Sequence, residues 1–315
     1  MSEERKIDTG EIPADKFKIV GKDLEKMESI SRPHLTFAQE VWRRMRSNKA
    51  AYISLIVLGI YVILAIAAPM VSPYGFDDQD PYAKRQFISA AHWFGTDALG
   101  RDLWVRLWMG SRVSLTIGLV AALANALIGA VLGGLCGYYG GKLDMIVMRI
   151  IDVIYGIPSL IVAILVMLVL GKGVMPLIVA MVAVGWTGTC RFTRGEVYRI
   201  KEQDFVAAAR VLGVSNFKIV VRQIIPNIMG LLITNLTMAI PGAIFQEAFL
   251  SYIGLGIVPP QASWGVLAKE GTAALRVAPH LLIIPAFFIC TTVLALNQIG
   301  NGLRDAFDPR LRGTD

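Results

Sequence analysis

The segment FVAAARVLGVSNFKIVVRQIIPN, residues 205–227, lies between two long apolar stretches but is itself too polar to enter a bilayer. Its first apolar side chains recur at spacings of three and four residues, which predicts one face of a helix. Gly213 can end that helix in a left-handed conformation, and Ser215 can cap a second helix. Pro226 closes the unit. The segment therefore predicts a short helix, a tight turn and another short helix.

The amino-acid composition is that of a membrane protein. Of the 315 residues, 55% are apolar and only 17% are charged. The net charge is +7, but the basic residues are spread between apolar stretches. That spacing favours anionic lipid headgroups as their partners and argues against nucleic acid. The three cysteines lack the paired spacing of a disulfide framework or a cysteine metal site, so we expect no bound metal.

Six uncharged stretches predict an all-α, polytopic membrane protein with six transmembrane helices. The spans are expected at residues 50–68, within 113–141, at 153–171, at 173–190, from 228 to 246, and at 281–300. Residues 248–268 are also uncharged, but their glycines and prolines would leave bare backbone in lipid. We therefore expect this stretch to fold back against the protein as a re-entrant loop.

These spans divide the chain into two tails, an outer loop and a core. Residues 1–49 form a tail with an amphipathic helix at the membrane surface, and residues 304–315 form the other tail. The loop 69–112 follows the first span, and residues 113–303 hold the remaining five spans with the polar segment 203–227. Most of the 31 Lys and Arg residues fall in the tails and in the loops after the second and fourth spans. The positive-inside rule therefore places both termini and the polar segment in the cytoplasm.

The polar segment resembles the loop shared by the membrane subunits of bacterial ABC importers. That loop reads Glu-Ala-Ala, three residues, Gly, nine residues, Ile, one residue, Leu-Pro. The matching positions here are Ala207, Ala208, Ala209, Gly213, Ile225 and Pro226. Two positions depart from the pattern, because Ala207 replaces the glutamate and Gln223 replaces the isoleucine. On the spacing alone, the alternative is an ordinary solvated helical hairpin between two spans.

Four further stretches resemble the C-type permeases of bacterial peptide importers. They are FGTDALGRDLWVRLWMGSRVSL at 94–115, FQEAFLSYIGLG at 245–256, SWG at 263–265 and NGLRDAFDPR at 301–310. The opening RPHLTFAQEVWRRMRSNKAA at 32–51 resembles oligopeptide permeases. The resemblance covers about residues 32–312, nearly the whole chain.

The resemblance implies a type I ABC importer permease fold in the bacterial plasma membrane. The chain would form half of the translocation path for oligopeptides that an extracellular or periplasmic binding protein delivers. Its other partners would be a homologous B-type permease and two cytoplasmic ATPases, with the polar segment docked in an ATPase groove. The sequence contains no G-x-x-x-x-G-K-[ST] phosphate loop. ATP and Mg would therefore be bound by the ATPases, and the chain would be a transporter subunit rather than an enzyme.

Ionisable and polar residues in the spans are candidates for the translocation path or its gate. They are Glu247, Asn235, Thr234 and Thr237. The alternative for Glu247, which we favour, is that it binds backbone or the Ser251 hydroxyl and holds the shape of the re-entrant loop. Asn235 and the threonines could instead join helices through hydrogen bonds.

A second group of candidates lies in the outer loop. Asp97, Arg101 and Asp102 are expected to fix this loop through hydrogen bonds, with contact to substrate or binding protein as the alternative. Arg149 and Asp152 are three residues apart and predict a structural ion pair on one helix.

The sequence lacks the motifs of two other functional classes, an intramembrane enzyme and an ion channel. An intramembrane enzyme would need a nucleophile–base pair or paired aspartates in the spans, and a channel would need a repeated pore loop or a charged ring. Neither pattern occurs in the sequence.

The family resemblance leaves several substrates open, because relatives in this family also carry dipeptides, glutathione or nickel. A bare metal ion needs several fixed ligands, which the spans do not offer, so we expect oligopeptides, with dipeptides, glutathione and nickel chelates as alternatives.

Overall fold

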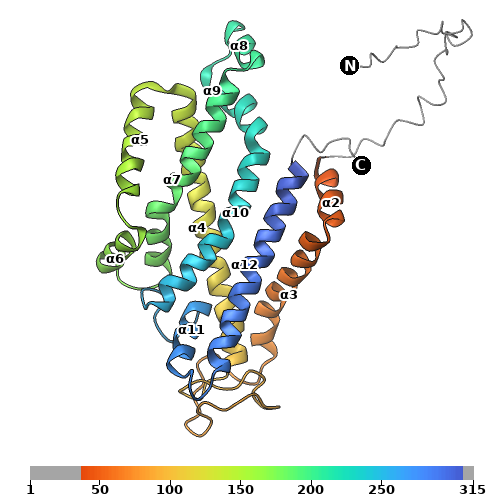
Figure 1. The fold of residues 1–315 in the computed structure, drawn as a ribbon, viewed down its shortest axis with the longest axis vertical. Coiled ribbons are helices and arrows are strands. Elements are labelled where there is room, and N and C mark those ends of the chain that lie inside the picture. Colours follow the sequence, from red (N-terminus) through yellow and green to blue (C-terminus); the bar gives the residue numbers. More distant parts are fainter. Residues whose placement is uncertain (1–36, 308–315) are drawn as a thin grey trace, which may run out of the picture. The chain divides into compact units, whose positions relative to one another are not determined.

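The computed structural model describes residues 37–307 (Figure 1). The bundle described below belongs to one compact unit that begins at Val41. The helices are α2 (Phe37–Ser47), α3 (Lys49–Val71), α4 (Leu103–Tyr139), α5 (Gly141–Tyr155), α6 (Ser159–Leu170), α7 (Val174–Lys201), α8 (Asp204–Val211), α9 (Asn216–Ile219), the π-helical turn η2 (Val220–Ile224), α10 (Ile225–Tyr252), α11 (Trp264–Ala273) and α12 (His280–Phe307). Most of the first predicted tail and residues 308–315 of the second lie outside the described residues.

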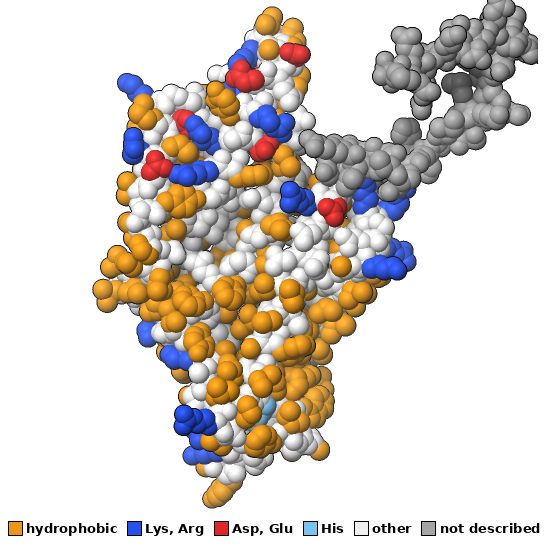
Figure 2. Space-filling model, in the orientation of Figure 1, with side chains coloured by type: hydrophobic (Ala, Val, Ile, Leu, Met, Phe, Trp, Pro, Cys, Tyr) orange, Lys and Arg blue, Asp and Glu red, His pale blue; other side chains and the backbone are white. Residues whose placement is uncertain are grey.

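Within residues 37–307, five helices are long and apolar enough to cross a membrane, and one bent pair adds a sixth crossing if it counts as a single span. The five are α3, α4, α7, the continuous segment Asn216–Tyr252 and α12. The predicted all-α class is confirmed, and the six expected spans correspond to these helices and the bent pair. Figure 2 shows apolar side chains in a broad belt, with charged side chains gathered toward α5 and α8. We call the end of the bundle that carries α8 the α8 end, and the end that carries α11 the α11 end.

Helix α4 begins ten residues before the predicted end of the outer loop. The loop was expected to reach residue 112 because residues 69–112 are rich in charge, but α4 starts at Leu103. Asp102 caps the helix, because its carboxylate accepts a hydrogen bond from the Val105 N–H at 3.0 Å. Two arginines in the first turns of α4 have protein partners. Charge therefore did not prevent these residues from forming the first turns of the helix.

One of these arginines, Arg112, completes the first span. Pro69 lies inside α3 and has no N–H to donate to the Ala65 carbonyl one turn earlier. The Arg112 guanidinium donates to that carbonyl, and its Nη2 donates to the Ile66 carbonyl at 2.9 Å. Helix α3 consequently continues to Val71, three residues past the predicted end of the span.

The third predicted span, residues 153–171, is not one continuous helix. Helices α5 and α6 meet at an angle of 91°, with the break at residues 156–158. Pro158 lies at the start of α6, where its missing N–H and fixed φ angle disfavour continuation of α5. Pro158 is a residue at which the sequence predicts a kink, and the break lies directly before α6, with Pro158 in its capping position.

The second half of the polar segment also differs from the prediction. Pro226 does not close a separate short helix, because α9, η2 and α10 follow one another without a break. The π-helical turn directly precedes Pro226, where the N–H of Ile225 donates to the carbonyl of Val220. A wider turn of this kind is one way in which a helix passes an irregular position. Toward the end of the described residues, α12 runs to Phe307 and includes the first residues of the predicted tail 304–315.

The long helices α4 and α7 pack through glycines. A Cβ atom on Gly129 would lie 2.6 Å from the Cβ of Thr189, and one on Gly133 would lie 2.3 Å from the Cys190 carbonyl oxygen. A Cβ on Gly137 would lie 2.7 Å from the Arg194 carbonyl oxygen. These glycines recur every four residues, so the two backbones touch along this seam, as in other closely packed membrane helices.

The expected re-entrant region contains a loop and the short helix α11. Its ten residues are too few to cross a bilayer. The helix lies against α10, α12 and α4 (Figure 1). Close backbone contact holds it there, because a Cβ on Gly265 would lie 2.3 Å from the Ala248 carbonyl oxygen and one on Gly271 equally close to that of Leu281. The stretch thus folds back on the bundle as predicted.

Candidate functional site

The hairpin formed by α8 and α9 is attached to the bundle by its own apolar residues. Val206 and Ala209, three residues apart on α8, are buried in a cluster that includes Ile219 and Tyr138. The Tyr138 hydroxyl donates to Asn216 Oδ1 at 2.7 Å. The hairpin therefore has a defined position on the ends of α4, α7 and α10.

The turn of this hairpin has the predicted left-handed residue. Gly213 has a φ of +73°, and the N–H of Val214 donates to the Ala209 carbonyl at 3.0 Å. Ser215 takes the capping position of α9 by its backbone, although its side chain makes no capping hydrogen bond. The prediction of a helix, a tight turn and a new helix start is confirmed up to this point.

The tip of the hairpin exposes large apolar side chains. Val211 is 88% exposed, Leu212 81% and Phe217 73%. Ala207 and Ala208 are exposed on the same helix. An apolar group of this size at the charged end of the unit is typical of a surface that binds another protein.

The candidate residues of the polar segment thus fall into two groups. Ala207, Ala208 and Gly213 lie at the surface, whereas Ala209 is 4% exposed and contacts its own chain. Ile225 and Pro226 lie in the first turn of α10, with Pro226 exposed. Sequence reasoning missed Val211 as a surface residue. The signal in the sequence is the spacing of Val206 and Ala209, which lie three residues apart and therefore share one face of α8. The structure buries that face and leaves Val211, on another face, exposed.

A buried network of ion pairs joins the loop before α4 to α11. Asp97 Oδ2 accepts from Arg101 Nε at 2.7 Å and also from Arg106 Nη1. Glu270 of α11 accepts from Arg106 Nη1 at 2.6 Å and from Arg101 Nη2 at 3.3 Å. The side chains of Asp97, Arg101 and Arg106 are at most 6% exposed. Because each charge has an opposite partner, the network fixes the loop on the bundle.

Asp102 belongs to the same region but has a different role. Besides capping α4, its Oδ2 lies 2.9 Å from His92 Nδ1. Both Asp97 and Asp102 are 4% exposed, which leaves little of their surface for a substrate or a binding protein. The arrangement favours the structural interpretation of Asp97, Arg101 and Asp102. Arg106 was missed because its charge was assigned to a loop.

Glu247 is fully buried in this chain. Its Oε1 accepts a hydrogen bond from the Ser251 hydroxyl at 2.7 Å, one turn along α10. The hydroxyls of Ser114 and Ser263 also surround the carboxyl group, and Ser114 Oγ accepts from the Trp264 N–H at 3.2 Å. Glu247 therefore lies where α4, α10 and the start of α11 meet, which favours a role in holding that junction.

The other polar candidates of the fifth span mostly bind within the bundle. Thr189 of α7 donates to Asn235 Oδ1 at 3.3 Å, so Asn235 joins α7 to α10. Thr234 and Thr237 donate to carbonyls of their own helix, four residues earlier. These contacts favour helix packing as the role of Asn235.

Two ion pairs at the α8 end join α5 to α7. Arg194 Nη2 donates to Asp144 Oδ2 at 2.6 Å, and Arg191 Nη2 donates to Asp152 Oδ1. The Arg191 guanidinium also lies 4.6 Å from the centre of the Tyr155 ring. The predicted pair between Arg149 and Asp152 is therefore wrong. Asp152 turns toward α7 because a partner on the neighbouring helix gives it a better contact than a residue on its own helix.

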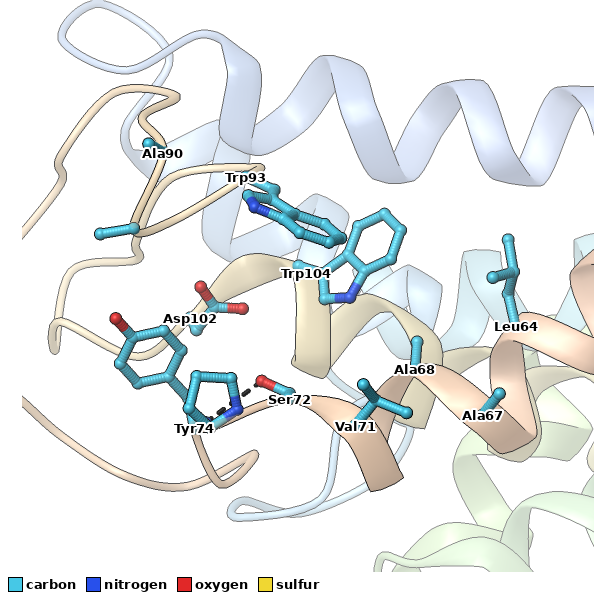
Figure 3. Close-up of a pocket in the computed structure, with 12 residues that line it drawn as sticks. Leu64, Ala67, Ala68, Val71, Ser72, Tyr74, Ala90, Trp93, Asp102 and Trp104 are labelled. Atoms are coloured by element: carbon cyan, nitrogen blue, oxygen red, sulfur yellow. Dashed lines mark hydrogen bonds between the residues drawn. The ribbon is translucent and has the colours of Figure 1, made fainter.

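The α11 end also holds an apolar cavity of about 520 Å³ between α3 and the following loop (Figure 3). Figure 3 shows Trp93 and Trp104 beside each other over the cavity, with Leu64, Ala68 and Val71 on α3 below them. The tryptophan rings are 5.0 Å apart in an edge-to-face arrangement. These walls suit an apolar group, and the polar residues Ser72, Tyr74 and Asp102 also line the cavity.

Residues 37–307 contain no group of three or more His, Cys, Asp or Glu side chains that could hold a metal ion.

Two families match parts of the chain. Residues 129–313 match the family described as binding-protein-dependent transport system inner membrane component. Residues 36–88 match the N-terminal transmembrane domain of oligopeptide transport permease C.

Curated relatives match nearly the full length of the chain. A dipeptide transport system permease protein of Bacillus subtilis is 43% identical, covering 96% of this chain and 95% of the relative. An oligopeptide transport system permease protein of the same organism is 42% identical over 96% and 99%. A glutathione transport system permease protein of Escherichia coli is 38% identical over 87% and 91%.

Proposed function

We propose, because this chain belongs to the family of binding-protein-dependent transport system inner membrane components, that it forms one half of a peptide path through the bacterial plasma membrane. Membership makes the chain a multi-pass membrane permease subunit of an ABC importer and not an enzyme. Such permeases work with other permease, ATPase and binding-protein subunits. The finer assignments below are our proposals.

The substrate class that we propose is oligopeptides. The relatives are named for dipeptides, oligopeptides and glutathione, which are all peptides. A bare divalent ion would need several fixed ligands in place of its water, and the described residues lack such a cluster. Dipeptides, glutathione and nickel chelates are the alternatives, since none of them needs fixed metal ligands in the path.

The partners that we propose are a homologous B-type permease, two ABC ATPases and an extracellular or periplasmic peptide-binding protein. ATP and Mg are bound by the ATPases. The α8 end lies in the cytoplasm together with both termini, since basic residues concentrate in the tails and in the loops at this end. The exposed apolar tip of the α8–α9 hairpin is the observation that carries the proposal, because it offers an ATPase groove a compact surface.

Leu212 provides a clean test of this contact. It is 81% exposed and has an ordinary φ of −74°, so substitution strains neither the core nor the turn. In the proposed complex, Leu212→Asp should reduce co-purification of the ATPases and abolish peptide-dependent ATP hydrolysis. Leu212→Met, which keeps an apolar side chain of similar size, should retain both. Normal co-purification and uptake with Leu212→Asp would contradict the assigned contact.

The substrate is tested in the reconstituted complex with its binding protein. ATP hydrolysis should rise with peptides of several lengths and should not rise with a nickel chelate. Stimulation by nickel chelates alone would refute the peptide assignment. Stimulation by dipeptides or glutathione but by no longer peptide would select the corresponding alternative.

A further inference from the structure

The break between α5 and α6 leaves an unusual surface on a predicted crossing. Tyr155 is 51% exposed and Ile157 41%, and Gly156 and Pro158 are exposed as well. Each helix end at a break leaves backbone groups without partners inside its own helix. Irregular backbone at membrane depth is tolerated only where protein or a water-filled cavity covers it. This surface is therefore unsuited to lipid.

An exposed ion pair adjoins the break. Asp152 is the last charged residue before the uncharged run 153–171, and Arg191 directly follows the uncharged run 173–190. Their side chains pair while remaining 51% and 44% exposed. Tyr155 connects the pair to the break, because its ring lies on the Arg191 guanidinium. Because both side chains are about half exposed, a carboxylate of a ligand can replace Asp152 as the partner of Arg191. An ammonium group of a ligand can likewise replace Arg191 as the partner of Asp152.

Polar groups continue from this pair into the apolar belt. Ser159, the first residue of α6 after the break, and Gln246 of α10 line a hollow of about 220 Å³ between α6, α7 and α10. On α7, the exposed residues next to Arg191 include Gly188 and Gly185. A Cβ on Gly188 would lie 3.9 Å from the Tyr155 hydroxyl, and one on Gly185 would lie 2.2 Å from the amide nitrogen of Asn125, so polar side chains from α5 and α4 adjoin these glycines. We call Asp152, Tyr155, Ser159, Arg191 and Gln246 the polar strip.

We propose that the polar strip is this subunit's wall of the peptide path, and that as a peptide passes, Arg191 contacts its carboxylate and Asp152 its ammonium group, one end at a time. The inference rests on the proposed function. Charge complementarity carries it, because a peptide in water is a zwitterion and the strip offers one group of each sign. The guanidinium can bind a carboxylate through two parallel hydrogen bonds. The core of a permanent contact with the second permease would instead be depleted in charged residues.

The test uses the complete importer in proteoliposomes, with the same binding protein throughout. Uptake of one peptide is compared with uptake of its C-terminally amidated form. Wild type should favour the free carboxylate, and Arg191→Gln should reduce this preference about tenfold, the effect of losing one charge-assisted contact. Arg191→Lys should retain part of the preference. Arg199→Gln is the matched control, because Arg199 lies on the same helix and pairs only with neighbouring Glu196 in the described contacts.

Asp152→Asn provides the complementary arm. It should reduce discrimination against an N-acetylated peptide and leave the response to amidation unchanged. An unchanged preference in Arg191→Gln, with peptide uptake intact, would overturn the inference alone, whereas absent peptide uptake in wild type would overturn the proposed function. Loss of the second permease from the purified Arg191→Gln complex would show that the polar strip is a subunit interface and would also overturn the inference.

Discussion

Arg106 at the α11 end and Arg191 at the α8 end both pair with carboxylates, but their surroundings differ. The Arg106 side chain is 1% exposed and shares Asp97 and Glu270 with Arg101. The Arg191 side chain is 44% exposed and pairs with Asp152, itself 51% exposed. Separating a buried charge from its partners is costly, whereas water can replace an exposed partner at little cost. The α11 end is thus fixed, and the α8 end can change its contacts.

The largest expected effect comes from breaking the buried network. Arg106→Gln would leave buried Asp97 and partly exposed Glu270 with Arg101 as their remaining close cation, and we expect destabilisation of about 3 kcal/mol, the lower end of the range for a broken buried pair. Thermal unfolding of the purified protein in detergent measures it. Arg191→Gln is the matched variant and should change stability by no more than about 1 kcal/mol. Equal unfolding temperatures for the two variants would remove the distinction between the ends.

An intermediate effect is expected in the seam that joins the two ends. Gly133→Ala would place a Cβ 2.3 Å from the Cys190 carbonyl oxygen, so α4 and α7 must separate, and we expect a loss of about 1–3 kcal/mol. Gly134→Ala is an adjacent control, because a Cβ there meets nothing within 4 Å. It should be neutral or stabilising by up to about 1 kcal/mol. Similar unfolding temperatures for both variants would show that the seam is not packed as described.

The smallest expected effect concerns the exposed pair itself. A double-mutant cycle with Asp152→Asn and Arg191→Gln should give a coupling energy of about 0–1 kcal/mol for unfolding. Added salt should lower it further, since exposed charges are screened. A coupling energy of several kcal/mol, insensitive to salt, would mean that this pair is as structural as the network at the α11 end.

Much of the fold follows from local sequence. Uncharged runs of sufficient length predicted the five long apolar helices of the described residues and part of the bent pair α5–α6, because the bilayer demands about 20 apolar residues per helix. The left-handed turn at Gly213 was predictable, since few other residues adopt that conformation. The failure of residues 248–268 to cross was also predictable from its glycines and prolines. Motif resemblance supplied the family, which residues 129–313 confirm.

Element ends and side-chain partners depended on contacts distant in sequence. Asp102 caps the start of α4 locally, but the Arg106 charge inside its first turns is balanced by Glu270, 164 residues later, and α3 passes Pro69 with help from Arg112. A sequence pattern assigns such charged residues to a loop, because their ion-pair and hydrogen-bond partners lie far away in the sequence.

The sequence by itself determined that this chain is a helical membrane permease subunit, because hydropathy, charge distribution and motifs are properties of consecutive residues. Only the tertiary structure decided which polar residues are buried and which are exposed. It buried Glu247 among serines from three elements and turned Asp152 away from Arg149 toward Arg191. The physical reason is that a charge takes the partner that packing brings within reach, and helix packing depends on residues far apart in the chain.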